Sequence, residues 1–238
     1  MIFRLNNEST GKFNLLIAII LFSIIYTSNS YSQTWTKVEG PKPYILKIFF
    51  PENKPSILAV SSESGEYESA LDLSQQNLQF PSFGEGFQMS IDSGKTFGEE
   101  KLLLYSVFEL IQQNDNSDRW YASVRSQGRG GIAVSTDNGN NWKTDFLLCD
   151  GTYQLLTIVS NKNNPNIFYG AAVKTDNGFV YTENSFSNCL SNQDLNIQSR
   201  SIATSPHNSN LLFIAGDNFY DGGVFRSYNN GQNWIKND

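Results

Sequence analysis

The sequence has few of the residues that most catalytic and metal sites require. It contains one histidine, His207, and two cysteines. A single histidine excludes a zinc site that needs two histidine ligands. A Ser-His-Asp triad would have to use His207, which stands in an Asn- and Pro-rich stretch typical of a turn. We therefore expect a solvated turn residue there, no metal site and no bound cofactor.

Basic residues do not gather anywhere in the sequence. The chain has 17 Lys and Arg against 23 Asp and Glu, which gives a formal net charge of −6. Nucleic-acid binding requires a clustered Lys/Arg face that neutralises phosphates. The charge pattern therefore excludes nucleic acid as a main partner.

Only one continuous apolar run reaches helical length, at residues 15–25. Arg4 and Lys12 precede it, and small residues stand before Gln33, as in a secretory signal peptide. The run is shorter than the ~20 residues that a bilayer span needs. We predict cleavage after residues 1–32, no stable membrane span afterwards, and a secreted, periplasmic or cell-surface protein; the alternative is an uncleaved anchor.

An eight-residue pattern recurs four times along the chain. Ser135–Trp142 is the clearest copy of this octad; Ser90–Phe97 and Ser227–Trp234 match it well, and Thr182–Cys189 matches it poorly. The copies are spaced by about 45 residues, and a fixed period of this length indicates an array of supersecondary units.

The octad has the composition of a hairpin turn. Gly supplies a positive φ, the Asp or Asn side chain accepts turn N–H groups, and the final aromatic residue begins the next strand. We interpret the following residues as structural: Ser90, Asp92, Gly94, Phe97, Ser135, Asp137, Gly139, Trp142, Ser227, Asn229, Gly231 and Trp234. A calcium site is not expected, because the octad lacks the alternating oxygen ligands and distal Glu of a calcium loop.

This octad resembles the Asp-box (BNR) repeat, Ser-x-Asp-x-Gly-x-Thr-Trp, of the β-propellers of sialidases, sortilin-type receptors, xyloglucan hydrolases and photosystem assembly factors. The resemblance extends from about Trp35 to the end of the chain and is weak in the third copy, where Phe186 and Cys189 replace Gly and Trp. It implies an all-β propeller of four-stranded antiparallel blades. It does not imply an activity, because one fold hosts many functions.

Each repeat can be divided into four short strands, A to D, rich in β-branched and aromatic residues and bounded by Gly, Pro, Asn, Asp and Ser. The repeats cover about 39–98, 99–143, 144–190 and 191–238. The predicted strands are 45–50, 57–61, 87–90 and 97–103; 107–112, 120–124, 132–135 and 142–147; 155–160, 167–173, 179–182 and a weak one after Cys189; and 201–204, 211–215, 224–227 and 234 onward.

Both ends of the mature chain read as a D strand. Gln33–Val38 resembles the start of the D strand at Trp142, and the last repeat already has its own D strand from Trp234. In a closed ring, both segments would therefore have to occupy the same position, the outer D strand of the last blade. Four blades is also the lower limit of the usual range for propellers. We expect an open arc of a larger propeller, completed by missing C-terminal blades or by self-association that covers exposed edges.

Strand alternation places the A–B and C–D turns on one face and the B–C and D–A connections on the opposite face, which we call the loop face. The octads lie around the rim of the first face and cannot converge on a site. The candidate ligand-binding residues of the loop face are Glu66, Tyr67, Asp72, Arg125, Arg129, Tyr153, Asp176, Asp217, Tyr220 and Asp221. The alternative is that they are ordinary solvated loop residues.

Two enzyme classes follow from the resemblance. Sialidases bind a substrate carboxylate with three convergent arginines, but no arginine here has the Arg-Ile-Pro setting found before the first Asp box, so we expect no sialidase activity. Glycoside hydrolysis by two carboxylates fits the acidic and aromatic loop face better. We predict a binding or scaffolding module for a glycan or protein ligand; the alternative is a polysaccharide-cleaving glycoside hydrolase or part of one.

The two cysteines occupy different places in their repeats. Cys149 ends strand D of the second repeat, whereas Cys189 replaces the octad aromatic of the third. A five-residue strand spans about 17 Å, and a disulfide needs Cα atoms about 4.4–6.8 Å apart. We therefore predict two free thiols.

Overall fold

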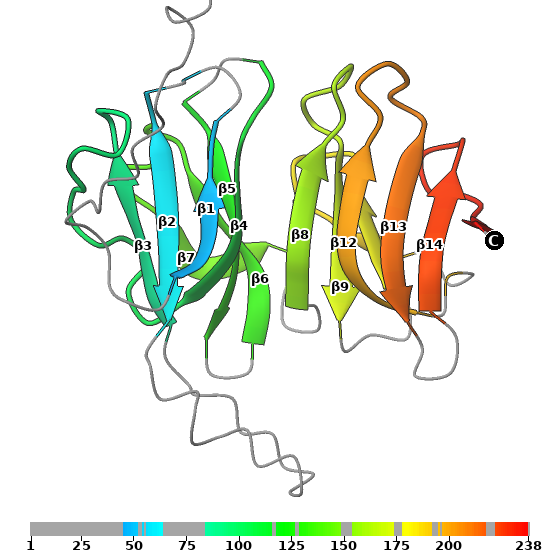
Figure 1. Cartoon of the computed structure of the whole chain (residues 1–238), viewed down its shortest axis with the longest axis horizontal. Helices are drawn as coiled ribbons and strands as arrows, with labels where there is room; N and C mark the ends of the chain where they lie inside the picture. Colours follow the sequence, from blue (N-terminus) through cyan, green and yellow to red (C-terminus); the bar gives the residue numbers. More distant parts are fainter. Residues whose placement is uncertain are drawn as a thin grey trace, which may run out of the picture. The chain divides into compact units, whose positions relative to one another are not determined.

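The computed structural model describes residues 45–51, 54, 56–63, 84–115, 118–126, 129–148, 154–173, 178–191, 195, 197–217 and 222–237. Their regular elements are all β-strands, arranged in four antiparallel sheets (Figure 1). No helix capable of crossing a membrane occurs within these ranges. The predicted signal peptide, the segment Gln33–Val38 and most of the loop face lie outside the described residues.

Each sheet contains strands in chain order, and consecutive repeats form consecutive sheets, which confirms the predicted fold class. The first sheet contains β1 (Ile45–Phe49), β2 (Leu58–Glu63) and β3 (Gly84–Ser90); the second contains β4 (Ser106–Gln112), β5 (Trp120–Ser126), β6 (Arg129–Ser135) and β7 (Lys143–Leu148); the third contains β8 (Gln154–Ser160), β9 (Phe168–Val173), β10 (Phe179–Thr182) and β11 (Leu190–Ser191); the fourth contains β12 (Gln198–Thr204), β13 (Leu212–Asp217), β14 (Gly222–Ser227) and β15 (Ile235–Asn237).

The first repeat departs from the prediction at its last strand. Residues 97–103 do not form a strand; isolated bridges instead join Phe87 to Lys101 and Gly84 to Leu104. The cause lies in the backbone, because Leu102 and Leu104 have φ of 53° and 72°. Positive φ values are incompatible with an extended strand, so the fourth position of this sheet is paired at two points only.

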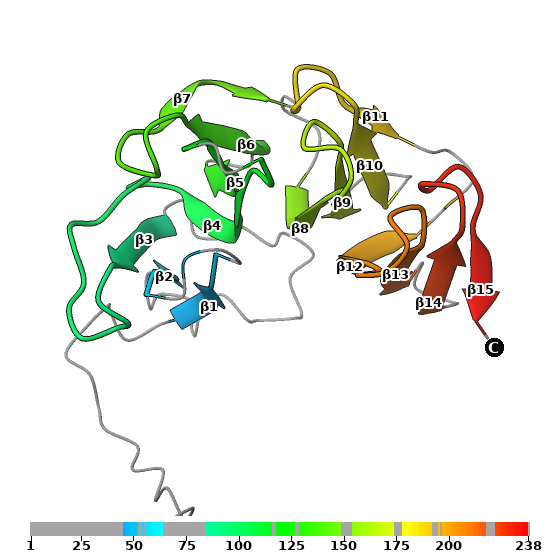
Figure 2. The same ribbon diagram turned by 90° about the horizontal axis from the view of Figure 1, so that it is seen from above.

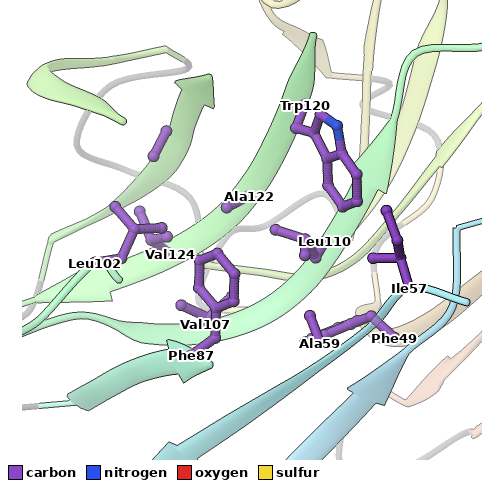
Figure 3. Close-up of a cluster of buried hydrophobic side chains, with 11 residues drawn as sticks. Phe49, Ile57, Ala59, Phe87, Leu102, Val107, Leu110, Trp120, Ala122 and Val124 are labelled. Carbon is purple, nitrogen blue, oxygen red and sulfur yellow. The ribbon is translucent and has the colours of Figure 1, made fainter. Parts of the chain in front are cut away.

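Each pair of consecutive sheets encloses a hydrophobic core. The first core lies between the first and second sheets and includes Phe87, Leu110 and Trp120 (Figure 3). The second and third cores include Tyr121 and Tyr169 respectively. Because side chains alternate along a strand, the adjacent residues Trp120 and Tyr121 of β5 enter different cores. Burial of each large side chain contributes about 2–3 kcal/mol to the stability of the fold. Each sheet is therefore stabilised by its contact with the next sheet along the chain.

All four octads fold into the same turn. In the second octad the hydroxyl of Ser135 accepts the N–H of Gly139 at 2.9 Å and donates to the carboxylate of Asp137 at 2.8 Å. Asp137 accepts the N–H of Asn141 at 2.8 Å. Asn138 and Gly139 have φ of 61° and 80°. The other three octads make the equivalent three bonds.

The octad aromatic packs against the sheet before it. The ring of Trp142 meets Phe87 of β3 edge-on, with ring centroids 5.7 Å apart. Trp234 makes the same contact with Phe179 of β10 at 5.1 Å. At Gly231 a side chain would collide with the Phe179 ring, so the turn needs glycine there for space as well as for its φ of 84°. The octads therefore join consecutive sheets.

The third octad forms the same turn, but it has a large side chain at the glycine position and a small one at the aromatic position. Phe186 stands at the glycine position with φ of 67° and is 3% exposed. Its ring packs on Phe168 and Tyr121, with centroid distances of 4.6 and 5.1 Å. Cys189, at the aromatic position, packs against the same core. The large group thus enters the core from the turn, and the small group stands where the others have an aromatic ring.

The prediction of two free thiols is wrong. Cys189 is disulfide-bonded, and its partner is Cys149, the other cysteine of the chain. The error came from treating β7 as a regular extended strand. The ends of Lys143–Leu148 pair with Val134 and Ile132, which are two residues apart on β6, so β7 contains an irregularity and advances little. Cys189 packs against the core that contains Ile132 of β6.

Candidate functional site

A cavity of about 160 Å³ lies where the inner strands end. β1, β4, β8 and β12 are the first strands of their sheets, and each contacts the next (Figure 2). The cavity opens on the side of the A–B turns and octads, opposite to the loop face. Its lining residues are Phe50, Pro51, Leu110, Ile111, Gln112, Gln113, Asn114, Ile158, Val159, Ser160, Lys162 and Thr204.

The lining combines apolar strand residues with amide and hydroxyl side chains. Among the described lining residues, Lys162 is the one charged side chain, and none is a carboxylate or a histidine. Glycoside hydrolysis uses a pair of carboxylates, which the described lining residues do not supply. Amides and hydroxyls both donate and accept hydrogen bonds. The cavity is therefore suited to holding a neutral polar group, and its volume admits a small one.

A hydrogen-bonded turn fixes the part of the lining that follows β8. The buried side chain of Asn161 accepts the N–H groups of Asn163 and Asn164 at 2.9 and 3.1 Å. Its amide also donates to the hydroxyl of Tyr169 at 2.9 Å. From the second sheet, the amide of Asn114 donates to the carbonyl of Asn161 at 3.0 Å. This turn thus joins the second and third sheets beside the cavity.

Two tyrosines extend this network to the neighbouring elements. The hydroxyl of Tyr169 donates to the side-chain oxygen of Asn230, in the fourth octad, at 2.8 Å. Burial raises the pKa of Tyr169, against an opposing hydrogen bond from Asn161, so the phenol stays neutral and remains a donor. Tyr121 donates to Gln113 of the lining at 3.2 Å. Two amide side chains of the lining, Asn114 and Gln113, are therefore held by hydrogen bonds within the protein.

The structure also contains an ion pair that the sequence reasoning missed. Lys47 of β1 and Glu109 of β4 are 2.6 Å apart, and Glu109 is 9% exposed. Burial raises the pKa of Glu109, while the hydrogen bond and charge of Lys47 oppose the shift. The sequence feature that could have indicated this pair is a single charged residue within each of two otherwise apolar inner strands, Lys47 in β1 and Glu109 in β4. Glu109 precedes Leu110 of the lining but does not line the cavity itself.

Seven of the ten predicted loop-face residues lie outside the described residues: Glu66, Tyr67, Asp72, Tyr153, Asp176, Tyr220 and Asp221. Arg125 and Arg129 lie together at the end of the β5–β6 hairpin. Asp217 ends β13 and forms an ion pair with Arg200 at 3.4 Å. The structure thus places the two arginines on the second sheet and the carboxylate on the fourth.

The octad carboxylates are engaged within their own turns. The pKa of Asp137 is lowered to about 2 by the backbone N–H of Asn141, then by the Asn141 side chain and the hydroxyl of Ser135. Asp92 has its pKa lowered to about 2 by the backbone and side chain of Thr96 and by Ser90. Such carboxylates are poor general acids or bases near neutral pH.

No protein-family model and no curated protein matches the chain. Its structure is similar to those of an ancestral GH74 enzyme and the GH74 xyloglucanase from Xanthomonas campestris, with TM-scores of 0.61 and 0.63. Identities are 16% and 11%; each comparison covers 87% of this chain, and 25% and 33% of the other chain. YCF48 from Cyanidioschyzon merolae has a TM-score of 0.53 and 15% identity, covering 82% of this chain and 57% of that one.

The chain has the β-propeller fold. Each of the four sheets is a blade, and each begins with its inner strand. Within the described residues the blades form three consecutive interfaces and do not close on themselves. At identities this low the likeness shows the fold alone, and the chain spans 25% to 33% of the two GH74 proteins.

Proposed function

We propose that this protein is an exported binding module whose propeller is built on Asp-box turns. One observation carries the proposal: the inner strands end around a cavity whose described lining residues offer amides, hydroxyls and apolar surface. Small-molecule sites are commonly concave, mostly apolar and equipped with a few fixed polar groups. A binding role needs nothing more than these features.

A neutral sugar unit is the ligand class that fits the cavity best. Sugar hydroxyls donate and accept hydrogen bonds, which matches side chains such as Ser160 and Thr204, and C–H faces of a sugar can lie on Leu110 or Ile158. The loop face, with Arg125 and Asp217, remains the second proposed surface and suits a larger glycan or a protein partner.

Export is part of the proposal. Residues 1–32 have the organisation of a signal peptide, and the disulfide of Cys189 supports an oxidising destination, because disulfides are rare in the cytosol. The Asp-box assignment is supported by the common turn of the four octads. Sequencing the N-terminus of protein collected outside the cells tests the export step, with Gln33 expected as the first residue.

Calorimetric titration with neutral oligosaccharides from xyloglucan, cellulose and mannan tests the binding role. Thr204→Val removes a cavity hydroxyl at nearly constant shape, and one lost hydrogen bond of about 1 kcal/mol predicts roughly fivefold weaker binding. Arg125→Ala, on the loop face, should leave binding unchanged. The reverse pattern would move the site to the loop face, and no heat with any of the three would contradict a glycan ligand.

Glycoside hydrolysis is the second candidate, favoured by the fold shared with GH74 enzymes. We place its two carboxylates on the loop face, where Asp176 and Asp221 lie outside the described residues. Incubation with the same polysaccharides decides between the classes. Release of reducing sugar that is lost in Asp176→Asn or Asp221→Asn would replace the binding role with catalysis.

A further inference from the structure

The interfaces between blades repeat one arrangement. The C strand of each blade receives the octad of the next: Phe87 of β3 contacts Trp142, and Phe179 of β10 contacts Trp234. The third octad packs in the core that contains Ile132 of β6. Every interface thus has two halves, a C-strand face and an octad. The aromatic position makes the contact in the second and fourth octads, and Phe186, at the glycine position, fills the core in the third.

The fourth blade has a C-strand face with no octad on it in the described part of the chain. Strand register places Ala203, Phe213, Ala215, Val224, Arg226 and Ile235 on one side of this blade, which we call the fourth-sheet face. The opposite side, with Ile202, Leu212 and Ile214, is buried in the third core. Val224 and Ile235 are 42% and 52% exposed.

Position by position, the fourth-sheet face matches faces that are buried elsewhere. Phe213 is the second residue of its B strand, as are Tyr121 and Tyr169, which the following blades bury to 1% exposure. Phe213 is only half-buried. The guanidinium of Arg226 lies 5.5 Å from the ring centroid of Tyr228, and its Nε is buried without a hydrogen-bond partner. This face is therefore an incomplete blade interface.

The other half of the interface is present at the opposite end of the chain. The first octad, Ser90–Phe97, has the standard turn, but no described blade precedes it and Phe97 belongs to none of the three cores. Ile91 of this octad is 73% exposed, and Ile48 of β1 in the same blade is 53% exposed. Within the described residues, one chain thus carries both complementary halves, and no described blade covers either of them.

We propose that the first octad and first blade of one copy dock on the fourth-sheet face of a second copy. The contact continues the interface that occurs three times within the chain, which is why a second copy, rather than an unrelated protein, is the fitting occupant. Phe97 would lie on Val224 and beside the Arg226 guanidinium, a cation–π arrangement. Such a heterologous contact closes into a ring or extends as an open chain.

Sedimentation velocity of the mature protein over a hundredfold concentration range tests the association. We expect dimers or larger assemblies that dissociate on dilution, and at least a tenfold rise in the dissociation constant for Val224→Lys and for Ile235→Lys. Leu190→Lys, at an exposed apolar position of the third blade, is the matched control and should associate normally. A wild type that stays monomeric throughout, or equal weakening by the control, would overturn the proposal.

Cross-linking identifies the surfaces without relying on any variant. A mixture of ¹⁴N- and ¹⁵N-labelled protein treated with an amine-reactive cross-linker should yield a mixed-isotope link between Lys95 of the first octad and Lys236 of β15. A link found only within one isotope would mean that the first and fourth blades meet in a single copy, and it would refute the intermolecular contact. Mixed links elsewhere in place of this one would refute the assigned faces.

Discussion

At Phe186 two physical requirements conflict. The turn needs a positive φ, which costs an L-residue other than glycine about 1–2 kcal/mol, whereas the core between the second and third blades needs a large apolar group. Phe186 meets the second requirement at the expense of the first, with φ of 67° and 3% exposure. Burial of the ring is the larger effect, because removing a buried Phe costs about 3–5 kcal/mol.

Substitutions at Phe186 should separate these two effects. Phe186→Ala loses the ring and keeps the backbone cost, so we expect a loss of about 4 kcal/mol. Phe186→Gly also loses the ring but relieves the backbone, so it should be about 1 kcal/mol more stable than Phe186→Ala. Urea unfolding of both variants measures the order. Equal stability, or alanine above glycine, would show that the turn carries no backbone cost.

The octad carboxylates should make stability depend on acid pH. Asp92 and Asp137 have pKa values lowered to about 2 from the ordinary 3.8. Because a lowered folded-state pKa favours the fold while the carboxylate is ionised, this contribution is present above pH 3.8 and is lost as the pH falls through about 2. Thermal unfolding between pH 2 and 5 should follow this course.

The chain supplies its own control for that experiment. The third and fourth octads have Asn184 and Asn229 at the same position, and their side-chain oxygens accept the same backbone N–H at 2.9 Å. The double variant Asp92→Asn, Asp137→Asn should therefore fold and show a shallower loss of melting temperature in acid. Superimposable pH profiles would rule out these carboxylates as the source.

At the level of the turn and its strands, Trp142 should be the main contact from the second octad to the first blade. Trp142→Ala removes a half-buried ring from its contact with Phe87, and we expect a loss of about 3 kcal/mol in unfolding free energy. Trp142→Phe keeps a ring but loses the hydrogen bond from the indole N–H to the carbonyl of Gly139. We therefore expect it to lower the unfolding free energy by only about 1 kcal/mol. A neutral Trp142→Ala would contradict the role of the octad as a joint.

The strands could be predicted because their signals are local. Apolar and polar residues alternate within each strand, and Gly, Asn and Pro mark the turns, so the predicted and observed elements nearly coincide. The exceptions arose where backbone irregularity overrides composition. Residues 97–103 read as a strand, but Leu102 and Leu104 adopt positive φ. In β7 the register is irregular, so the length of the strand could not be used to separate the two cysteines.

For the molecule as a whole, the cavity could not be read from the sequence. Its lining gathers residues from the ends of β4, β8 and β12 and from the segment after β1, each of which looks like an ordinary strand end or turn. The network around Asn161 has the same character, because turn-rich Asn residues are common in hairpins. Only the packing of the inner strands places these groups around one space.

The disulfide should stabilise the second and third blades as one unit. Cys149→Ser leaves the core position of Cys189 intact and removes the bond, which closes a long loop, so we expect a loss of about 3 kcal/mol. In thermal unfolding, dithiothreitol should lower the melting temperature of the wild type to that of the Cys149→Ser variant. The melting temperature of the variant should not respond to the reductant. A wild type that is insensitive to the reductant would contradict the bond.

The same bond determines how the chain would respond to tension. A pull on the two ends would run through the sulfur atoms and bypass everything between Cys149 and Cys189, which includes β8, β9 and β10. An extended chain gains about 3.5 Å per residue, so the bypassed stretch of about 40 residues would keep roughly 140 Å of length in reserve. Under load, the third blade would lengthen only after reduction of this bond, which would make it the part of the protein that is protected from stretching.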